Sequence, residues 1–350
     1  MGFDISYHAV DVDFIQQRLL SYVMGQGDID ELLETAVRVS TTRFRANAWG
    51  LGAMKACNPP RQAPVGPKKP GLLARFFGKS APAAEPQTPA TEPPCKFESD
   101  LYVWGRPFFI TSQDPQEVSE TIDRYLNAAA SDIVDQIARE MLAGLAPSLV
   151  DTVQPDMTGT IPPDDAVKED TRSQLDQLRG AYEAIATGQK VSAPGGEQVA
   201  PDEFLAQFVP LTILSLASLF RPGWMARGHV WPTEMLKKAG LDVGAFFEPA
   251  GAIFQPLLER APTVTRFLEP TITSNYTVGG FVPADKVASL KQCIQDNREK
   301  ILAPAAAEDW GDYAAVCLDK ILETLHDAER RKMAFIEASE VYSAPMGIMN

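Results

Sequence analysis

The C-terminal part of the chain carries the pattern that most constrains the fold. From Thr271 to Val278 most residues are β-branched, aromatic or small polar, and the run stops at Gly279-Gly280, a pair that adopts positive φ angles without steric cost. This pattern predicts a strand that ends in a turn. The segment from Met333 to Ala338 is too short for a helix, and its residues alternate in character. It predicts a second strand, antiparallel to the first.

Two amphipathic helices are predicted between these strands. Each shows apolar side chains at helical spacing, which places them on one face of the helix. The apolar positions are Val287, Leu290, Ile294 and Ile301 in the first helix, and Ala314, Cys317, Leu318, Ile321, Leu325 and Ala328 in the second. The C-terminal unit is therefore predicted to be strand, helix, helix, strand.

The remainder of the chain is predicted to be mostly helical. Gly2 to Val10 reads as an opening strand, and Leu101 to Thr111 is predicted to form a hairpin with its turn at Gly105-Arg106-Pro107. Amphipathic helical patterns dominate from Asp114 onward, and the apolar run from Leu211 to Phe220 predicts the most buried helix. The fold class is therefore expected to be α+β, predominantly helical, with one small mixed or antiparallel sheet.

A change in composition divides the chain into three parts. Residues 58–97 are rich in proline and alanine, a composition that disfavours both helix and strand and predicts a disordered insert. Residues 1–57 form an N-terminal strand and helices, and residues 98–350 a helical body that includes the C-terminal unit. We expect these two parts to make one compact domain.

The insert contains a short apolar cluster flanked by cations. A membrane-binding or docking segment is one hypothesis for it, because apolar area beside basic residues favours binding to an anionic lipid surface. Docking on a partner protein and folding back onto the acidic body of the same chain are the alternatives. The residues concerned are Leu72, Leu73, Arg75, Phe76 and Phe77.

The charge of the protein limits its partners. The 350 residues carry a formal net charge of −14, whereas nucleic-acid binding requires a basic face. A nucleic-acid partner is therefore not expected. An acidic protein meets a basic protein partner efficiently, although acidity also serves solubility.

The cysteines and apolar segments indicate a cytoplasmic location. Cys57, Cys95, Cys293 and Cys317 show no close spacing, so neither a redox pair nor a zinc cluster is expected, and the thiols are predicted to be reduced. No signal-peptide pattern is recognisable, and the run from Leu211 to Phe220 is too short to cross a bilayer.

No strong catalytic pattern is present. The sequence lacks the motifs of serine hydrolases, zinc proteases, P-loop proteins and kinases, and neither a cofactor nor a metal is predicted. His8 and His229 remain candidate general bases, because a histidine titrates near neutral pH and a neighbouring carboxylate could orient it. A hydrolase or transferase that uses one of them is thus an alternative function.

Three segments at the two ends of the chain resemble a group of uncharacterised bacterial cytosolic proteins. They are Gly2 to His8 (GFDISYH), Tyr276 to Pro283 (YTVGGFVP) and Phe335 to Tyr342 (FIEASEVY). The resemblance implies that the two ends of the chain meet, so we predict that the opening strand, the Tyr276 strand and the Ile336 strand share one sheet, with the C-terminal helices on one face. Some such small acidic proteins are similar to immunity proteins that neutralise bacterial toxins.

The favoured hypothesis is a non-enzymatic, partner-binding protein, with an immunity protein for a basic toxin as one form of it. Its contact surface is predicted to consist of loops rich in aromatic residues and arginine, the types that contribute most binding energy at interfaces. Peripheral membrane association through residues 66–80 is a further alternative. The predicted contact residues are Tyr7, His8, Trp104, Arg106, Trp224, Arg227, His229 and Trp231.

Overall fold

A computed structural model describes residues 4–58, 95–228, 230–264, 270–306 and 311–341. Its centre is an antiparallel sheet of four strands, β1 (Asp4–Val10), β4 (Trp224–Arg227), β5 (Val278–Val282) and β6 (Ala334–Ser339), in the order β4-β1-β6-β5. The predicted α+β class is confirmed. The two ends of the chain meet as expected, since Ile5 pairs with Ser339 and His8 with Ile336.

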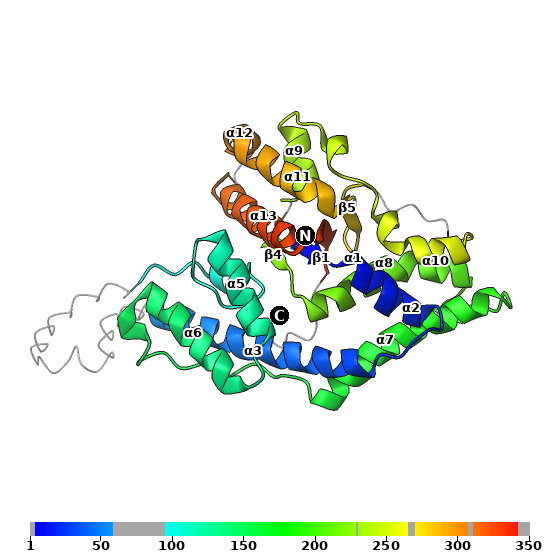
Figure 1. Ribbon diagram of the computed structural model, residues 1–350, viewed down its shortest axis with the longest axis horizontal. Coiled ribbons are helices and arrows are strands. Elements are labelled where there is room, and N and C mark those ends of the chain that lie inside the picture. Colours follow the sequence, from blue (N-terminus) through cyan, green and yellow to red (C-terminus); the bar gives the residue numbers. More distant parts are fainter. Residues whose placement is uncertain (1–3, 59–94, 229, 265–269, 307–310, 342–350) are drawn as a thin grey trace, which may run out of the picture.

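Helices make up most of the described chain (Figure 1). The N-terminal half contains α1 (Val12–Phe14), the π-helix η1 (Ile15–Leu20), α2 (Ser21–Val23), α3 (Asp30–Cys57), α4 (Ser99–Tyr102), α5 (Pro115–Leu126) and α6 (Ser131–Leu145). The C-terminal half contains α7 (Asp164–Ile185), α8 (Pro201–Phe220), α9 (Pro232–Lys238), α10 (Gln255–Arg260), α11 (Ala284–Asp296), α12 (Arg298–Ala306) and α13 (Gly311–Arg331). Short 3-10 turns lie at Pro147–Leu149, Val243–Ala245 and Ala250–Phe254, and a minor ribbon pairs β2 (Val191–Ser192) with β3 (Gln198–Val199).

Helices pack against both faces of the four-stranded sheet. Ile5, Tyr7 and Phe335 belong to one apolar cluster with residues of α11 and α13, whereas Val10 and Ile336 belong to a second cluster with residues of α8 and of the first half of α3. Because successive side chains of a strand point to opposite faces, both sets are buried in one sheet. This confirms the expected placement of the C-terminal helices on one face.

The C-terminal unit differs from the prediction at its first strand. Residues 271–277 lie outside β5, and the predicted turn at Gly279-Gly280 is part of the strand. The pairing register shifts between Gly279 and Phe281, and Gly280 has a φ of 58°. A Cβ atom at Gly280 would lie 2.3 Å from Cγ of Glu337. The glycine therefore forms a β-bulge that accommodates a buried side chain on β6.

The predicted hairpin at Leu101 to Thr111 is wrong. The segment begins with α4 and continues as an irregular loop whose residues from Phe108 to Ile110 are fully buried. The guanidinium of Arg106 donates hydrogen bonds to the carbonyl oxygens of Ile110 and Ser112, at 2.7 Å each. This side chain satisfies backbone groups that a hairpin partner would otherwise satisfy.

Two helices also differ in length from the prediction. The apolar stripe from Val287 to Ile301 is divided between α11 and α12, which separate at Asn297. The helix predicted at Leu211 to Phe220 begins at Pro201 and includes Pro210. With 20 residues and a mean hydropathy of 1.6, α8 is long and apolar enough to span a membrane, and half of that window is buried inside the protein. The prediction that this apolar run is too short no longer holds for the whole helix.

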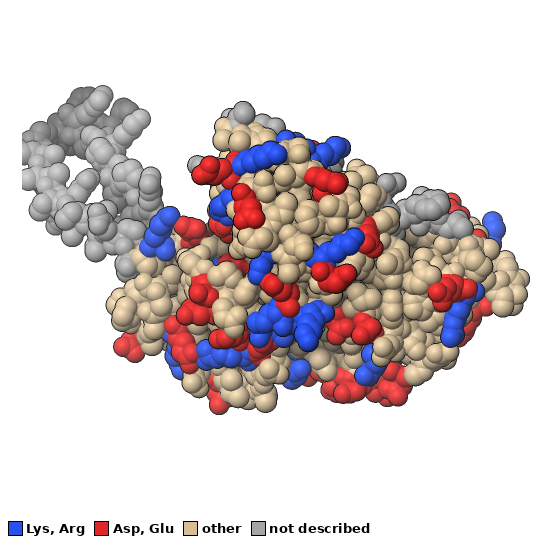
Figure 2. Space-filling view, turned by 45° about the horizontal axis from the view of Figure 1, so that its top comes forward, with Lys and Arg blue, Asp and Glu red and all other residues tan. Residues whose placement is uncertain are grey.

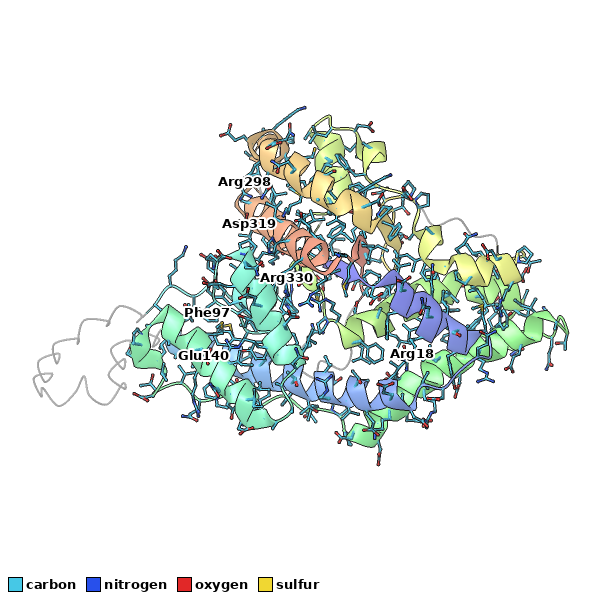
Figure 3. The ribbon with its side chains drawn as sticks, viewed as in Figure 1. Arg18, Phe97, Glu140, Arg298, Asp319 and Arg330 are labelled. Carbon is cyan, nitrogen blue, oxygen red and sulfur yellow. A yellow bond between two sulfur atoms is a disulfide. The ribbon has the colours of Figure 1, made fainter. Side chains whose placement is uncertain are left out.

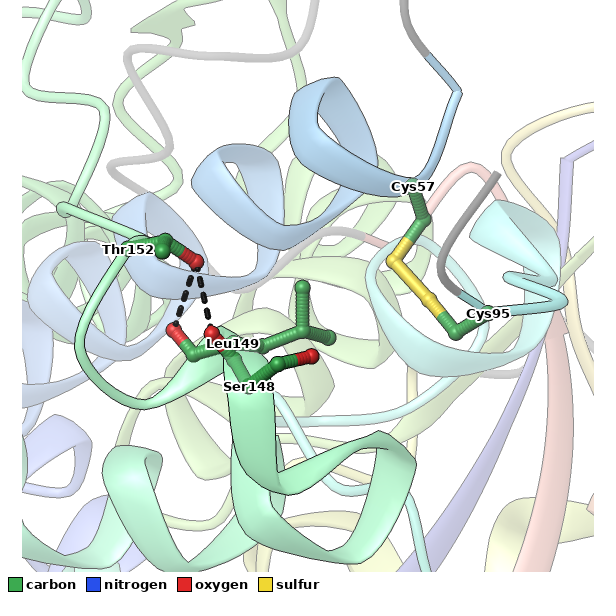
Figure 4. Close-up of a disulfide and its surroundings, with 5 residues drawn as sticks. All are labelled: Cys57, Cys95, Ser148, Leu149 and Thr152. Atoms are coloured by element: carbon green, nitrogen blue, oxygen red, sulfur yellow. Dashed lines mark hydrogen bonds between the residues drawn. A yellow bond between two sulfur atoms is a disulfide. The ribbon is translucent and has the colours of Figure 1, made fainter. Parts of the chain in front are cut away.

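A disulfide lies beside a third apolar cluster at the end of α3. Cys57 and Cys95 are bonded to each other with their Cα atoms 5.5 Å apart (Figure 4), so the prediction of reduced thiols is wrong for this pair. The two residues are 38 positions apart in sequence, and sequence spacing alone gave no sign that the chain returns to the same point. Cys293 and Cys317 are free. Leu72, Leu73, Arg75, Phe76, Phe77 and most of the predicted insert lie outside the described residues.

Candidate functional site

The eight predicted contact residues do not form one surface. Tyr7, His8, Arg106 and Trp224 are buried, at 3 % exposure or less, so the prediction that they lie in exposed loops is wrong. They belong to β1, to β4 and to the loop between α4 and α5. Trp104 and Trp231 are partly buried, Arg227 is exposed and His229 lies outside the described residues. Strand β4 was not predicted, because it is only four residues long and its three buried residues, followed by the exposed Arg227, show no alternation of polarity.

His8 is held between two serine hydroxyls. Its Nε2 lies 2.8 Å from Oγ of Ser6, and its Nδ1 lies 2.8 Å from Oγ of Ser218 on α8. Burial, with the neighbouring Arg43 cation, lowers the pKa of His8 from 6.5 to about 3. The ring is therefore neutral at physiological pH. The Ser218–His8 distance would suit a nucleophile and its base, but both side chains are buried, at 2 % and 3 % exposure.

Arg106 and Trp224 belong to a buried polar network centred on Glu323 of α13. The Nε of Arg106 donates to Oε2 of Glu323 at 3.0 Å, and its Nη2 donates to Oε1. The indole N–H of Trp224 donates to Oε2 at 3.1 Å. Because the carboxylate and the guanidinium are both shielded from water, breaking this pair by removing one partner would leave an uncompensated buried charge. The network therefore fixes α13 to β4 and to the loop before α5, rather than presenting a binding surface.

Trp104 and Arg227 do meet, at the edge of a small cavity beside Lys320. Asp100 and Tyr313 line the same space, whose volume is about 10 Å³. The ammonium of Lys320 donates to the carbonyl oxygen of Met225 at 3.0 Å, and burial lowers its pKa. A cavity of this size holds one water molecule, so no substrate fits beside Lys320 in this conformation.

A larger groove lies between α7 and α8. Its volume is about 400 Å³, within the range of sites that bind small ligands or single anchoring side chains. The floor is apolar and consists of Val167 on α7 with Leu216 and Leu219 on α8, each no more than 6 % exposed. Thr171 also lines the floor, but its hydroxyl is satisfied by the carbonyl oxygen of Val167 at 2.8 Å. We call this cavity the α7–α8 groove.

Acidic residues stand at the rim of the α7–α8 groove. Asp170 of α7 is exposed, and Glu340 lies just beyond the end of β6. Glu340 has a φ of 59°, a left-handed conformation that is uncommon for residues other than glycine and that recurs at functional sites. Its backbone N–H donates to the carbonyl oxygen of Asp4 at 2.9 Å. The N–H of Asp4 donates in turn to Oε1 of Glu340 at 3.5 Å, so the start of β1 holds Glu340 beside the groove.

The cations of α7 are directed to other partners. Lys168 pairs with Glu34 and Arg172 with Asp30, both on or at the start of α3, whereas Arg179 pairs with Glu183. None of these salt bridges involves Asp170. Elsewhere on the surface, acidic and basic residues are interspersed, as the face in Figure 2 shows. The α7–α8 groove thus combines an apolar floor with the carboxylates of Asp170 and Glu340 at its rim.

Sequence reasoning missed this site because its two walls come from different helices. The apolar faces of α7 and α8 were each visible as a periodic pattern, but nothing local indicates that residues 167 and 216 meet. No family model, curated protein sequence or solved structure matches the chain. The groove is therefore interpreted from its own geometry and chemistry.

Proposed function

We propose that the protein binds a partner protein, and that the α7–α8 groove receives an apolar side chain from a basic segment of that partner. The observation that carries the proposal is a groove of about 400 Å³ that has an apolar floor and the carboxylates of Asp170 and Glu340 at its rim. Burial of a large apolar side chain supplies about 1.5–3 kcal/mol. Carboxylates at the rim favour an anchor flanked by lysine or arginine and raise the rate of encounter.

The overall charge supports the same proposal. A net charge of −14 attracts a basic partner over a longer range than the groove itself does. A basic toxin would be one partner of this chemistry, which keeps an immunity function among the forms of the proposal. The disulfide between Cys57 and Cys95 weighs against the predicted cytoplasmic location, since such bonds persist mainly in oxidising compartments.

The proposal can be tested with defined peptides. The probes are fluorescein-labelled pentapeptides in which a central leucine, phenylalanine or tryptophan is flanked by two lysines on each side, and binding is measured by fluorescence polarisation. A peptide with central glycine carries the same charge without the anchor. We expect binding to require the apolar residue and to weaken as salt is added, because exposed charges are screened.

Two variants locate the binding in the groove. Ala166 is exposed and lines the groove, so Ala166→Trp fills the cavity without disturbing the core and is expected to abolish binding. Asp170→Lys is expected to weaken binding about tenfold. The matched control is Ala143→Trp, at an exposed alanine of α6. Equal binding by wild type and Ala166→Trp, or equal binding of the glycine peptide, would refute the proposal.

A further inference from the structure

A second cavity, rich in arginine and hydroxyl groups, lies between α3 and the turn that joins α5 to α6. Its volume is about 190 Å³. One wall is a face of α3 that presents Arg38, Thr41, Thr42 and Arg45. The opposite wall is the turn from residue 128 to residue 131, where three alanines leave the space open. We call this space the arginine cavity.

The N-terminus of α6 faces the arginine cavity without a side-chain cap. Its N-cap residue is Ala130, and no side chain accepts a hydrogen bond from the first turn. The N–H groups of Ser131 and Asp132 meet no acceptor within the described residues. Unsatisfied N–H groups at the start of a helix carry partial positive charge and bind anions. The helix has 15 residues, long enough for this effect.

The side chain of Thr42 gives an independent indication of a ligand. It is only 5 % exposed, yet it lines the cavity and its hydroxyl has no hydrogen-bond partner in the part of the chain that the structure describes. Thr35 and Thr171, by contrast, satisfy their hydroxyls on the carbonyl four residues earlier in their helices. The Thr42 hydroxyl is not shut off from solvent, so it is open to the cavity, where a ligand or water can satisfy it.

The two arginines keep donors available for such a ligand. Arg45 uses Nε and Nη2 in a bidentate pair with Asp135, at 2.6 and 2.7 Å, and no described residue accepts a hydrogen bond from its Nη1. Arg38 donates from Nη1 to the carbonyl oxygen of Leu126. Asp135 does not line the cavity, and it accepts a further hydrogen bond from the indole N–H of Trp49 at 2.8 Å. The residues that line the cavity thus include two arginines and no carboxylate.

We propose that the arginine cavity binds a phosphate group. Guanidinium groups, hydroxyls and backbone N–H groups at a helix start are the donors that a tetrahedral oxyanion accepts. Free phosphate and the phosphate of a small monoester share this chemistry. The site is separate from the α7–α8 groove, so the two proposals can fail independently.

The test is isothermal titration calorimetry of the full-length protein at constant ionic strength, with inorganic phosphate, glycerol 1-phosphate and chloride as probes. We expect phosphate-containing probes to bind and chloride not to bind. Tighter binding of glycerol 1-phosphate identifies a monoester as the ligand, whereas equal affinities identify free phosphate. Absence of binding by both phosphate probes overturns the proposal.

Variants assign the binding to the cavity. Arg38→Gln and Thr42→Val are each expected to weaken phosphate binding about tenfold or more. Since the Thr42 hydroxyl has no partner, Thr42→Val should leave the thermal midpoint without phosphate unchanged or raised, which separates lost binding from lost folding. Arg172→Gln removes a partly buried arginine that pairs with Asp30 on α3 and should bind phosphate as wild type does. Unchanged affinity in both cavity variants contradicts the assignment.

Discussion

At the scale of single residues, two buried titratable groups on neighbouring strands make contributions to stability that change in opposite directions with pH. Glu337 of β6 is fully buried and accepts hydrogen bonds from the N–H of Thr233 at 3.1 Å and from the hydroxyl of Thr233. Burial raises the pKa of Glu337 from 4.5 to about 7. His8 of β1 lies on the opposite face of the sheet, and burial lowers its pKa to about 3.

The two shifts have opposite effects on the free energy of unfolding. Glu337 binds its proton more tightly in the folded state, so its contribution of about 3 kcal/mol is present below pH 4.5 and is lost as the pH rises through 7. His8 binds its proton less tightly in the folded state. Its contribution, about 5 kcal/mol, is present above pH 6.5 and is lost as the pH falls toward 3. Between pH 5 and 6.5 the two contributions offset each other.

We therefore predict that replacing either residue reveals the pH dependence that the other residue gives to the free energy of unfolding. Glu337→Gln preserves the shape of the protonated side chain, and its stability should rise by about 2 kcal/mol from pH 5 to pH 7 relative to wild type. His8→Gln should show the opposite sign. Urea unfolding at pH 5, 6 and 7 measures both slopes, with Glu120→Gln at an exposed position as the control. Slopes of the same sign in the two variants would disprove this account.

At the scale of elements, the disulfide joins the end of α3 to the segment that leads into α4. It closes a loop of about 38 residues, and a cross-link of that span stabilises a folded protein by about 4 kcal/mol in the chain-entropy model. The apolar cluster beside it includes Trp49, Phe97 and Leu142, which come from different elements. Without the bond, the α4 segment would be held to this cluster mainly by apolar packing.

We predict that Cys57→Ser lowers the free energy of unfolding by about 4 kcal/mol, and that reductant has the same effect on wild type. Thermal and urea unfolding with and without dithiothreitol measure the change. Cys293→Ser is the control, because this cysteine is free and only partly buried; it should alter stability by less than about 1 kcal/mol and should keep its sensitivity to reductant. Wild-type stability that does not respond to reductant would contradict the prediction.

The elements also show which parts of the structure a sequence can predict. Helices α7 and α13 were predictable because each carries its buried face as a local 3.6-residue period. The loop after α4 was mistaken for a hairpin because its apolar residues are buried by distant parts of the chain, such as Tyr125 of α5, whose ring stacks on Phe108. The contact between α13 and α5 also joins residues far apart in the sequence. Arg330, labelled on α13 in Figure 3, forms a hydrogen bond with Ser119 and a salt bridge with Asp123, both on α5, and neither helix indicates this contact by itself.

The candidate sites were less predictable than the helices for the same reason. Each combines side chains that are far apart in sequence, such as Thr42 with Ser131 in the arginine cavity and Val167 with Leu216 in the α7–α8 groove. The residue types that attract attention in a sequence, Trp224, Arg106 and His8, instead satisfy one another or their neighbours in the core. A rare polar residue therefore indicated a buried network more reliably than it indicated a surface.

At the scale of the whole molecule, β1 is an interior strand that only distant parts of the chain can pair. It forms one ladder with β4 and another with β6, more than 200 and more than 300 residues away. The chain must therefore close two very long loops before its central sheet exists, which slows folding. β1 also contributes Ile5, Tyr7 and Val10 to the core, each no more than 2 % exposed.

Removal of residues 1–10 should consequently prevent folding of the entire protein. The lost side chains alone account for roughly 1.5–3 kcal/mol each, and the loss of both ladders separates β4 from β6. Together these losses are comparable to the total stability of a typical protein, about 5–15 kcal/mol. We predict that the truncated chain lacks cooperative urea unfolding and near-ultraviolet circular dichroism.

A synthetic peptide of residues 1–12 should restore both signals, whereas a scrambled peptide should not. A truncated chain that unfolds cooperatively with the m-value of the full protein would show instead that the helical layers fold without the sheet, because m scales with the surface exposed on unfolding.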